Sequence, residues 1–177
     1  MWAFGVIAFA QSEAPQVSSA SVVKQGELAE TSQDGLRLCS DEELGLRFLC
    51  DPAWTVLSGK EKIILVAGED PTAVIALRFN KTTIRYLEQL GCEKLEAMGH
   101  YQTGFVRQRV PLVGKEAIAV KGVDRKDHSV RLLDYYFLKG SKLYSLSFSL
   151  NPAQSWDQWA ALFSRVAESL EFIPDSQ

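Results

Sequence analysis

Residues 129–150, SVRLLDYYFLKGSKLYSLSFSL, constrain the fold more than any other stretch of the chain. Gly140-Ser141 lies between two apolar-rich runs, as a two-residue hairpin turn does. After this turn, apolar residues alternate with Ser145, Ser147 and Ser149, which is the period-2 pattern of a strand with two different faces. Before it, apolar side chains fall on both faces, as in a central strand that is covered on both sides. The segment therefore predicts an antiparallel sheet with a cover on each face.

Further strands are expected before and after a first helix. The helix is expected at 83–98, where apolar residues recur at three- and four-residue steps. The runs 62–68 and 72–80 are rich in Ile, Val and Leu and are separated by a turn signal, so they predict a hairpin. The other expected strands are 45–52, 54–57, 104–112 and 116–124. Because the connections are too short for crossover helices, the sheet is expected to be antiparallel.

The clearest helix in the sequence closes the domain. Five large apolar residues share one helical stripe: Trp156, Trp159, Phe163, Val166 and Leu170. Two tryptophans on such a stripe favour burial against a broad, flat sheet face. Ser155 and Gln158 have the spacing of a capping box at the start of this helix. The fold class that follows is α+β, with one antiparallel β-sheet flanked by helices, one on each face or both on the same face.

The segment ELGLRFLCDPAWTV, residues 43–56, resembles the opening of PsbP-like domains, in which Gly-apolar-x-Phe runs into Pro-x-x-Trp. Here the pattern is Gly45, Phe48, Pro52 and Trp54, with the Trp one position closer than in the commonest spacing. The family includes photosystem II PsbP and bacterial DcrB-like envelope proteins. The order of elements up to the closing SLEF motif, 169–172, is also similar to that family. The resemblance implies an α/β/α sandwich, export, and an accessory or binding role without catalysis.

The first ten residues have the composition of a secretory signal. They form a short apolar stretch that ends in Ala8-Phe9-Ala10, the small-x-small pattern found before a signal-peptidase cut. The stretch is far shorter than the roughly 20 apolar residues of a transmembrane helix. No Lys or Arg precedes Lys24, so the basic part of such a signal is missing. A signal of this kind predicts export to the periplasm or the cell exterior. The alternative is that these residues form an apolar strand or helix of the domain itself.

The rest of the chain divides into a linker, a domain and a tail. Residues 11–35 are rich in Ser, Ala, Gln and Glu and contain no aromatic residue, so we expect a flexible linker. Residues 36–174 are expected to form a single PsbP-like domain, and 175–177 a tail.

Three cysteines occur, at positions 39, 50 and 92. Leu36 to Cys39 and Leu46 to Cys50 fit the two arms of a hairpin, which would bring Cys39 near Cys50. An exported protein could oxidise this pair to a disulfide, and two buried thiols are the alternative. No two cysteines have the C-x-x-C spacing, so a redox or zinc motif is not indicated.

Composition and motifs argue against several classes of function. The net charge is −3 and no dense run of Lys or Arg occurs, so nucleic acid is not an expected partner. A nucleophile elbow, a dinucleotide fingerprint, a Walker loop, a zincin motif and an EF-hand loop are all absent from the sequence. We therefore expect no enzyme, and we assign no cofactor and no metal ligand.

A few polar residues on the expected strands are candidates for contacts with a ligand or partner. Asp134 lies among apolar residues and needs a partner, for which Arg107 and Arg109 are the obvious choices. Ser145 and Ser147 are small enough to admit a helix or to line a groove. A Ser-His-Asp arrangement of a serine with His128 and Asp134 lacks the activated setting that a nucleophile needs on a regular strand.

Two functional hypotheses remain. The first is an exported, non-enzymatic module that binds a protein or a component of the cell envelope. The second is a small-molecule or lipid carrier with a pocket between sheet and helix, walled by Trp156, Trp159 and the serines.

Overall fold

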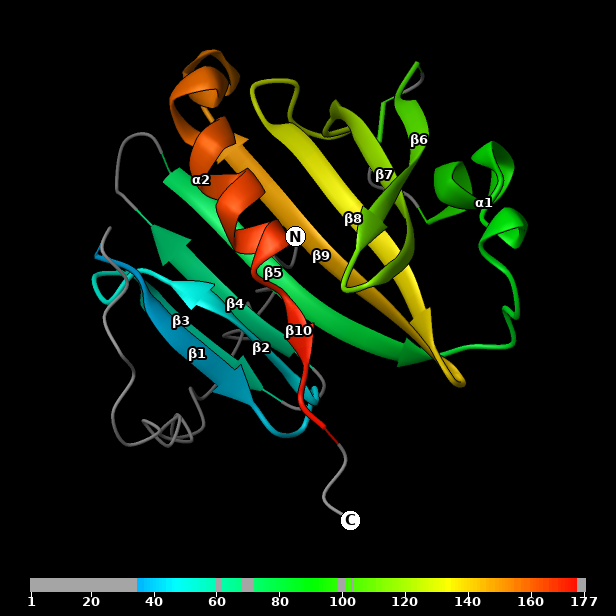
Figure 1. The fold of residues 1–177 in the computed structure, drawn as a ribbon. Helices are drawn as coiled ribbons and strands as arrows, with labels where there is room; N and C mark the ends of the chain where they lie inside the picture. The colour runs from blue at the N-terminus through cyan, green and yellow to red at the C-terminus, as the bar shows by residue number, and fades with distance from the viewer. Residues whose placement is uncertain (1–34, 60–61, 68–71, 99–100, 103, 175–177) are drawn as a thin grey trace, which may run out of the picture.

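The computed structural model describes residues 35–59, 62–67, 72–98, 101–102 and 104–174. The expected signal at 1–10, the linker up to residue 34 and the tail at 175–177 lie outside the described residues. The described part contains a seven-stranded sheet, a three-stranded sheet and two helical regions. The smaller sheet and the helical regions pack as layers on the seven-stranded sheet (Figure 1). This arrangement agrees with the α+β class expected from the sequence.

The larger sheet has the strand order β3-β4-β5-β9-β8-β7-β6, and every neighbouring pair is antiparallel. The expected 62–80 hairpin and the meander that ends at residue 150 are both confirmed. Gly140 adopts a φ of 60° in the turn between β8 and β9, which favours glycine. Its strands are β3 (Thr55–Gly59), β4 (Lys62–Ala67), β5 (Thr72–Lys81), β6 (Val106–Leu112), β7 (Lys115–Val123), β8 (Arg131–Lys139) and β9 (Lys142–Asn151).

A smaller sheet of three strands contains β1 (Arg37–Asp41), β2 (Leu46–Cys50) and β10 (Glu171–Phe172), in the order β1-β2-β10. The sequence predicted the β1–β2 hairpin but placed all strands in one sheet, which is wrong. The chain end returns to this sheet as its third strand, where Phe172 lies opposite Leu46 on β2.

The two cysteines of the β1–β2 hairpin are joined as a disulfide. Cys39 lies opposite Phe48, and Cys50 lies opposite Arg37, so the two cysteines are diagonal neighbours. Their Cα atoms are 5.9 Å apart, within the usual range for disulfides. That this pair is oxidised in the native compartment stays a prediction.

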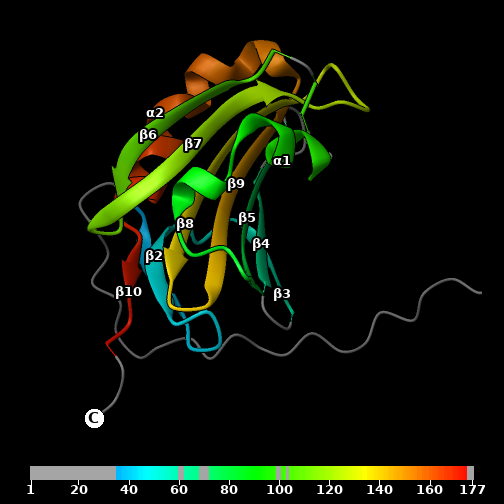
Figure 2. The same ribbon diagram turned by 90° about the vertical axis from the view of Figure 1, so that its right-hand side faces the viewer.

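The smaller sheet and the helix α2 (Trp156–Glu168) cover one face of the larger sheet, which we call the α2 face (Figures 1 and 2). A short 3-10 helix, η2 (Ala153–Ser155), precedes α2. The ring of Phe163 on α2 lies 4.7 Å from that of Phe148 on β9. The expected stripe on α2 therefore faces the core, although Trp159 stays half-buried. The expected capping box does not form, since Ser155 makes no side-chain cap hydrogen bond.

The opposite face carries Ser145, Ser147 and Ser149, and we call it the serine face. Part of it is covered by the 3-10 helix η1 (Leu87–Gln89) and the helix α1 (Cys92–Ala97). One continuous helix at 83–98 was expected, but Leu90 leaves the helical conformation with a ψ of 58° and Gly91 is extended. The apolar side chains of the segment are buried nonetheless: Ile84, Leu87, Leu90 and Leu95.

In the described part of the chain, no helix is long and apolar enough to cross a membrane.

Candidate interaction surface

All five candidate residues lie on the serine face, in two neighbouring rows that run across the strands. In the first row Arg107 lies opposite Val120, Val120 opposite Asp134, and Asp134 opposite Ser147. The second row contains Arg109, Ile118, Tyr136, Ser145 and Arg78, in that order across the sheet. The sheet thus brings the candidates to one face. β7 lies between β6, which carries both arginines, and β8, which carries Asp134.

Asp134 is buried at the centre of this face, with 4% of its surface exposed. The hydroxyl of Tyr101, which follows α1, donates a hydrogen bond to its carboxylate. The hydroxyls of Tyr101 and Tyr136 also lie 2.7 Å apart. Burial, and secondly the charge of Asp134, raise the pKa of both tyrosines above the ordinary value. The two phenols therefore stay neutral and serve as hydrogen-bonding groups.

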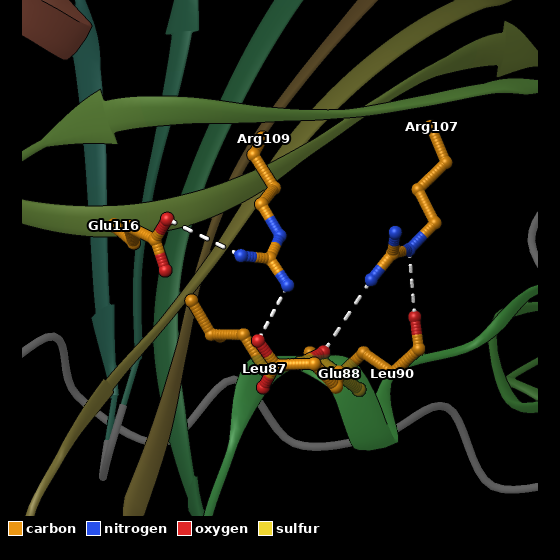
Figure 3. A network of polar contacts seen from close by, with 6 residues as sticks. All are labelled: Leu87, Glu88, Leu90, Arg107, Arg109 and Glu116. Atoms are coloured by element: carbon orange, nitrogen blue, oxygen red, sulfur yellow. Dashed lines mark hydrogen bonds and ion pairs between the residues drawn. The ribbon is translucent and has the colours of Figure 1, made fainter.

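The contacts that the structure shows for Arg107 and Arg109, the expected partners of Asp134, are with other groups. The guanidinium of Arg107 donates to the carbonyl oxygens of Leu90 at 2.8 Å and Leu87 at 3.5 Å (Figure 3). Since Val120 lies between Arg107 and Asp134 on the intervening strand, the two side chains attach about two strand spacings apart, roughly 10 Å. Arg107 therefore supplies a donor to the carbonyl of Leu90 at the end of η1, while the carbonyl of Leu87 also accepts a hydrogen bond from the N–H of Leu90.

Arg109 forms an exposed ion-pair network beside Arg107. Its two terminal nitrogens lie 2.5 Å from a carboxylate oxygen of Glu88 on η1 and 3.4 Å from one of Glu116 on β7 (Figure 3). Both arginines of β6 therefore attach the η1 segment to the sheet, a role that no sequence pattern indicated.

The serine hydroxyls have partners that do not prepare them for nucleophilic attack. Ser145 is buried, and the Nε of Arg78 donates a hydrogen bond to its oxygen at 3.0 Å. The hydroxyl of Ser149 donates to the carbonyl of Val74 at 3.5 Å. His128 is exposed in the turn between β7 and β8, and no hydrogen bond among the described residues joins it to a serine.

The carboxylates of the same turn bind its own backbone. One oxygen of Asp124 accepts hydrogen bonds from the N–H groups of Lys126 and Asp127, at 2.7 and 2.9 Å. The Ser129 hydroxyl, together with its N–H, lowers the pKa of Asp127. Within the described residues, no group of three or more His, Cys, Asp or Glu side chains is placed to hold a metal ion.

The half of the serine face beyond β9 carries apolar side chains that no described helix or strand covers. Leu57 on the edge strand β3 is 53% exposed. The neighbouring side chains on β4, β5 and β9 are half-buried although they lie inside the sheet. We call this surface the open patch; it contains Leu57, Ile64, Val66, Val74, Ala76, Ser147 and Ser149.

Sequence reasoning missed most of the open patch. The runs at 62–68 and 72–80 are apolar on both faces, which is the pattern of strands covered on both sides. The structure covers them on the α2 face alone, as far as the described residues go. The apolar character of both faces was the signal available in the sequence. It does not tell whether one of the two faces stays uncovered, or which one.

The expected carrier pocket does not form, because its two walls lie on opposite faces. Trp156 and Trp159 pack against Phe163 on the α2 face. Ser145 and Ser147 point to the serine face, since β9 side chains alternate between the faces.

No family model matches this chain, and no curated protein matches its sequence. A solved structure of cyanobacterial PsbP, CyanoP, from Synechocystis sp. PCC 6803 aligns over 84% of this chain and 98% of its own, with a TM-score of 0.58 and 16% identity.

The chain has a PsbP-like fold.

Two more solved structures share the PsbP-like fold. PA94 from Pseudomonas aeruginosa, described as a protein of unknown function and putative regulator, aligns with a TM-score of 0.52 and 10% identity, over 80% of this chain and 99% of its own. The Ran-binding protein Mog1p from Saccharomyces cerevisiae gives a TM-score of 0.51 and 8% identity, over 78% and 95% of the two chains. The family resemblance read from Gly45, Phe48, Pro52 and Trp54 is thus confirmed at the level of the fold.

Proposed function

We propose that this PsbP-like domain is a non-catalytic binding module that holds a protein partner on the open patch. The observation that carries the proposal is the set of aliphatic side chains left uncovered on β3, β4 and β5. A soluble domain gains free energy when a partner covers such a surface, at roughly 25 cal/mol per Å² of apolar area.

The chemistry around the open patch supports binding and gives no support to catalysis. The hydroxyls of Ser145 and Ser149 are hydrogen-bonded to Arg78 and to the carbonyl of Val74. The phenols of the nearby Tyr101 and Tyr136 stay neutral because their pKa is raised. One protein of the same fold, Mog1p, is described as a Ran-binding protein. A PsbP-like scaffold can therefore serve protein binding, and we extend that role, without its particular partner, to this chain.

We further propose that the module is exported. The apolar stretch that ends at Ala10 and the PsbP-like resemblance support this proposal. The mass of the protein isolated from its own cells tests it. A mature chain that begins near residue 11 and is recovered outside the cytoplasm is expected, and an intact cytoplasmic chain would contradict export.

Site-specific photo-crosslinking tests the binding surface. A photo-reactive amino acid is placed at Ser147 in the open patch and, in a second protein, at the exposed Ala161 on α2. Each protein is expressed in its own cells and irradiated there. We expect one discrete protein adduct from Ser147 and none of that mass from Ala161.

Three outcomes would contradict the proposal. They are an adduct of the same mass from both positions, a crosslink from Ser147 to residues of the same chain, and an adduct to lipid or another small molecule. A competing substitution sharpens the result: Leu57→Asp changes an exposed side chain and should remove the adduct while the melting temperature stays within a few degrees.

A further inference from the structure

Strand β3 is an edge of the seven-stranded sheet, and one side of its backbone is open. Among the described strands it pairs with β4 alone. Because alternate residues of a strand point their N–H and C=O groups to opposite sides, part of β3 directs these groups away from β4. Between described residues, no hydrogen bond reaches this open side. Such a row of backbone donors and acceptors is a template for another strand.

The sequence of β3 lacks the features that protect a sheet edge. Its five residues, TVLSG, include no charged residue and no proline. The opposite edge of the same sheet, β6, contains two arginines and Pro111. The edge strand β1 of the smaller sheet begins with Arg37 and ends with Asp41. Since charges and proline oppose pairing with another chain, β3 is the edge most open to an added strand.

Leu57 lies at the centre of β3 and is 53% exposed. Its side chain points to the serine face, opposite Ile64 on β4. On an edge strand, neighbouring side chains cover such a residue from one side only. An apolar side chain directly opposite Leu57 on an added strand would cover it from the other side.

We propose that β3 pairs antiparallel with β3 of a second copy of this chain, about a twofold axis at Leu57. A twofold axis between antiparallel strands stands perpendicular to the sheet, so the residues that meet come from the same face of the strand. With Leu57 opposite Leu57 of the second copy, Thr55 meets Gly59 and Val56 meets Ser58. All five residues of each strand are then paired, and any other register leaves some of them unpaired.

A second copy satisfies every requirement of this edge. The pairing brings no charges together, because β3 has none, and it places two exposed leucines in contact. Cross-strand apolar pairs stabilise a sheet, whereas like charges in opposite positions destabilise it. Twofold dimers are also the commonest symmetric assemblies of soluble proteins. The two open patches then lie side by side on one face of the joined sheet, since the axis preserves the face.

Sedimentation velocity of the purified full chain tests the pairing. One short strand per copy buries less than the roughly 1,200 Å² of a stable interface, so we expect a dissociation constant on the order of 10–100 µM. Leu57→Asp places two carboxylates opposite each other at the axis and should raise this constant by about tenfold or more. The matched control is Leu38→Asp on β1, where the leucine is 45% exposed, and it should change the constant by less than about twofold.

Disulfide trapping tests the register and does not depend on a charged variant. In a chain with Cys92→Ser, the further substitution Leu57→Cys should give a covalent dimer on oxidation. Directly opposite residues have Cα atoms about 4.5–5.5 Å apart, within the range of disulfides. Thr55→Cys is the control, because Thr55 meets Gly59 and lies about 14 Å along the strands from its own copy. A gel run without reductant should show a dimer for Leu57→Cys alone.

Three results would overturn the proposal. The first is an unchanged protein that remains a single chain at about 1 mM, which would leave the edge to a strand of another protein. The others are equal weakening by the two aspartate variants, and trapping of Thr55→Cys as readily as of Leu57→Cys. The pairing does not rest on the function proposed above, because purified protein alone suffices to test it. Ser147, which tests the open patch, is separated from β3 by β4 and β5.

Discussion

Tyr101 donates a hydrogen bond to Asp134 in the middle of β8, 33 residues further along the chain. The contact joins the segment that contains η1 and α1 to the centre of the serine face. Leu90 and Leu95 of the same segment pack against the sheet, and both are fully buried. Beyond this segment the serine face remains open, so the position of Tyr101 helps to decide how much of the sheet is available to a partner.

Replacement of Tyr101 by Phe should lower the free energy of unfolding by about 2 kcal/mol, because a buried carboxylate then loses a donor. Tyr86→Phe is the matched control, since that ring is 69% exposed, and it should change the value by less than about 0.5 kcal/mol. Urea unfolding followed by fluorescence measures both. Equal effects of the two substitutions would show that the Tyr101 hydroxyl does not stabilise the segment.

Alkaline pH should destabilise the protein through its buried tyrosines. Burial raises the pKa of Tyr101 and Tyr136, so the folded state keeps both phenols protonated when the unfolded chain begins to ionise near pH 10 or so. The protonated phenols therefore make their full contribution to the free energy of unfolding below that pH. The contribution is lost as the pH rises further, at up to about 1.4 kcal/mol per pH unit for each tyrosine.

Unfolding measured at about pH 8 and pH 11 checks this dependence. The loss of stability should be smaller in the variant with Tyr101→Phe and Tyr136→Phe than in the unchanged protein. The prediction is wrong if both proteins lose the same free energy over this interval.

The two arginines of β6 should contribute unequally to stability. Arg107→Ala leaves the carbonyl of Leu90 without its side-chain donor and should cost about 1–3 kcal/mol. Arg109→Ala removes an exposed ion pair with Glu88 and should cost less than about 1 kcal/mol. Thermal unfolding of both variants provides the measurement, and a larger effect at Arg109 would refute this order.

The bond between Cys39 and Cys50 should stabilise the protein. For a sequence separation of 11 residues, loss of the disulfide should cost about 3 kcal/mol. Alkylation of the denatured, unreduced protein should modify Cys92 alone, as judged by mass, and reduction should lower the melting temperature. Alkylation of all three thiols in protein from its own compartment would show that the bond does not form there.

Local patterns were sufficient for most of the strands and for α2. The alternation after Gly140 and the stripe from Trp156 to Leu170 each predicted an element that the structure contains. The helix expected at 83–98 was the main local error, because Gly91 interrupts it without disturbing the apolar spacing. Of the candidate site, the sequence placed Asp134 and the serines on one face of neighbouring strands, but it did not indicate that Tyr101 is a partner of Asp134.

The sequence by itself determined which side chains share a face, because alternation along a strand is a local property of the backbone. The tertiary structure alone decided which faces meet. Packing placed Tyr101 against Asp134, put the tryptophans and the serines on opposite sides of the sheet, and left Leu57 exposed. It also gathered Lys115, Lys139 and Lys142 around one aromatic cluster. Such groupings depend on strand order and on long-range register, which no local pattern encodes.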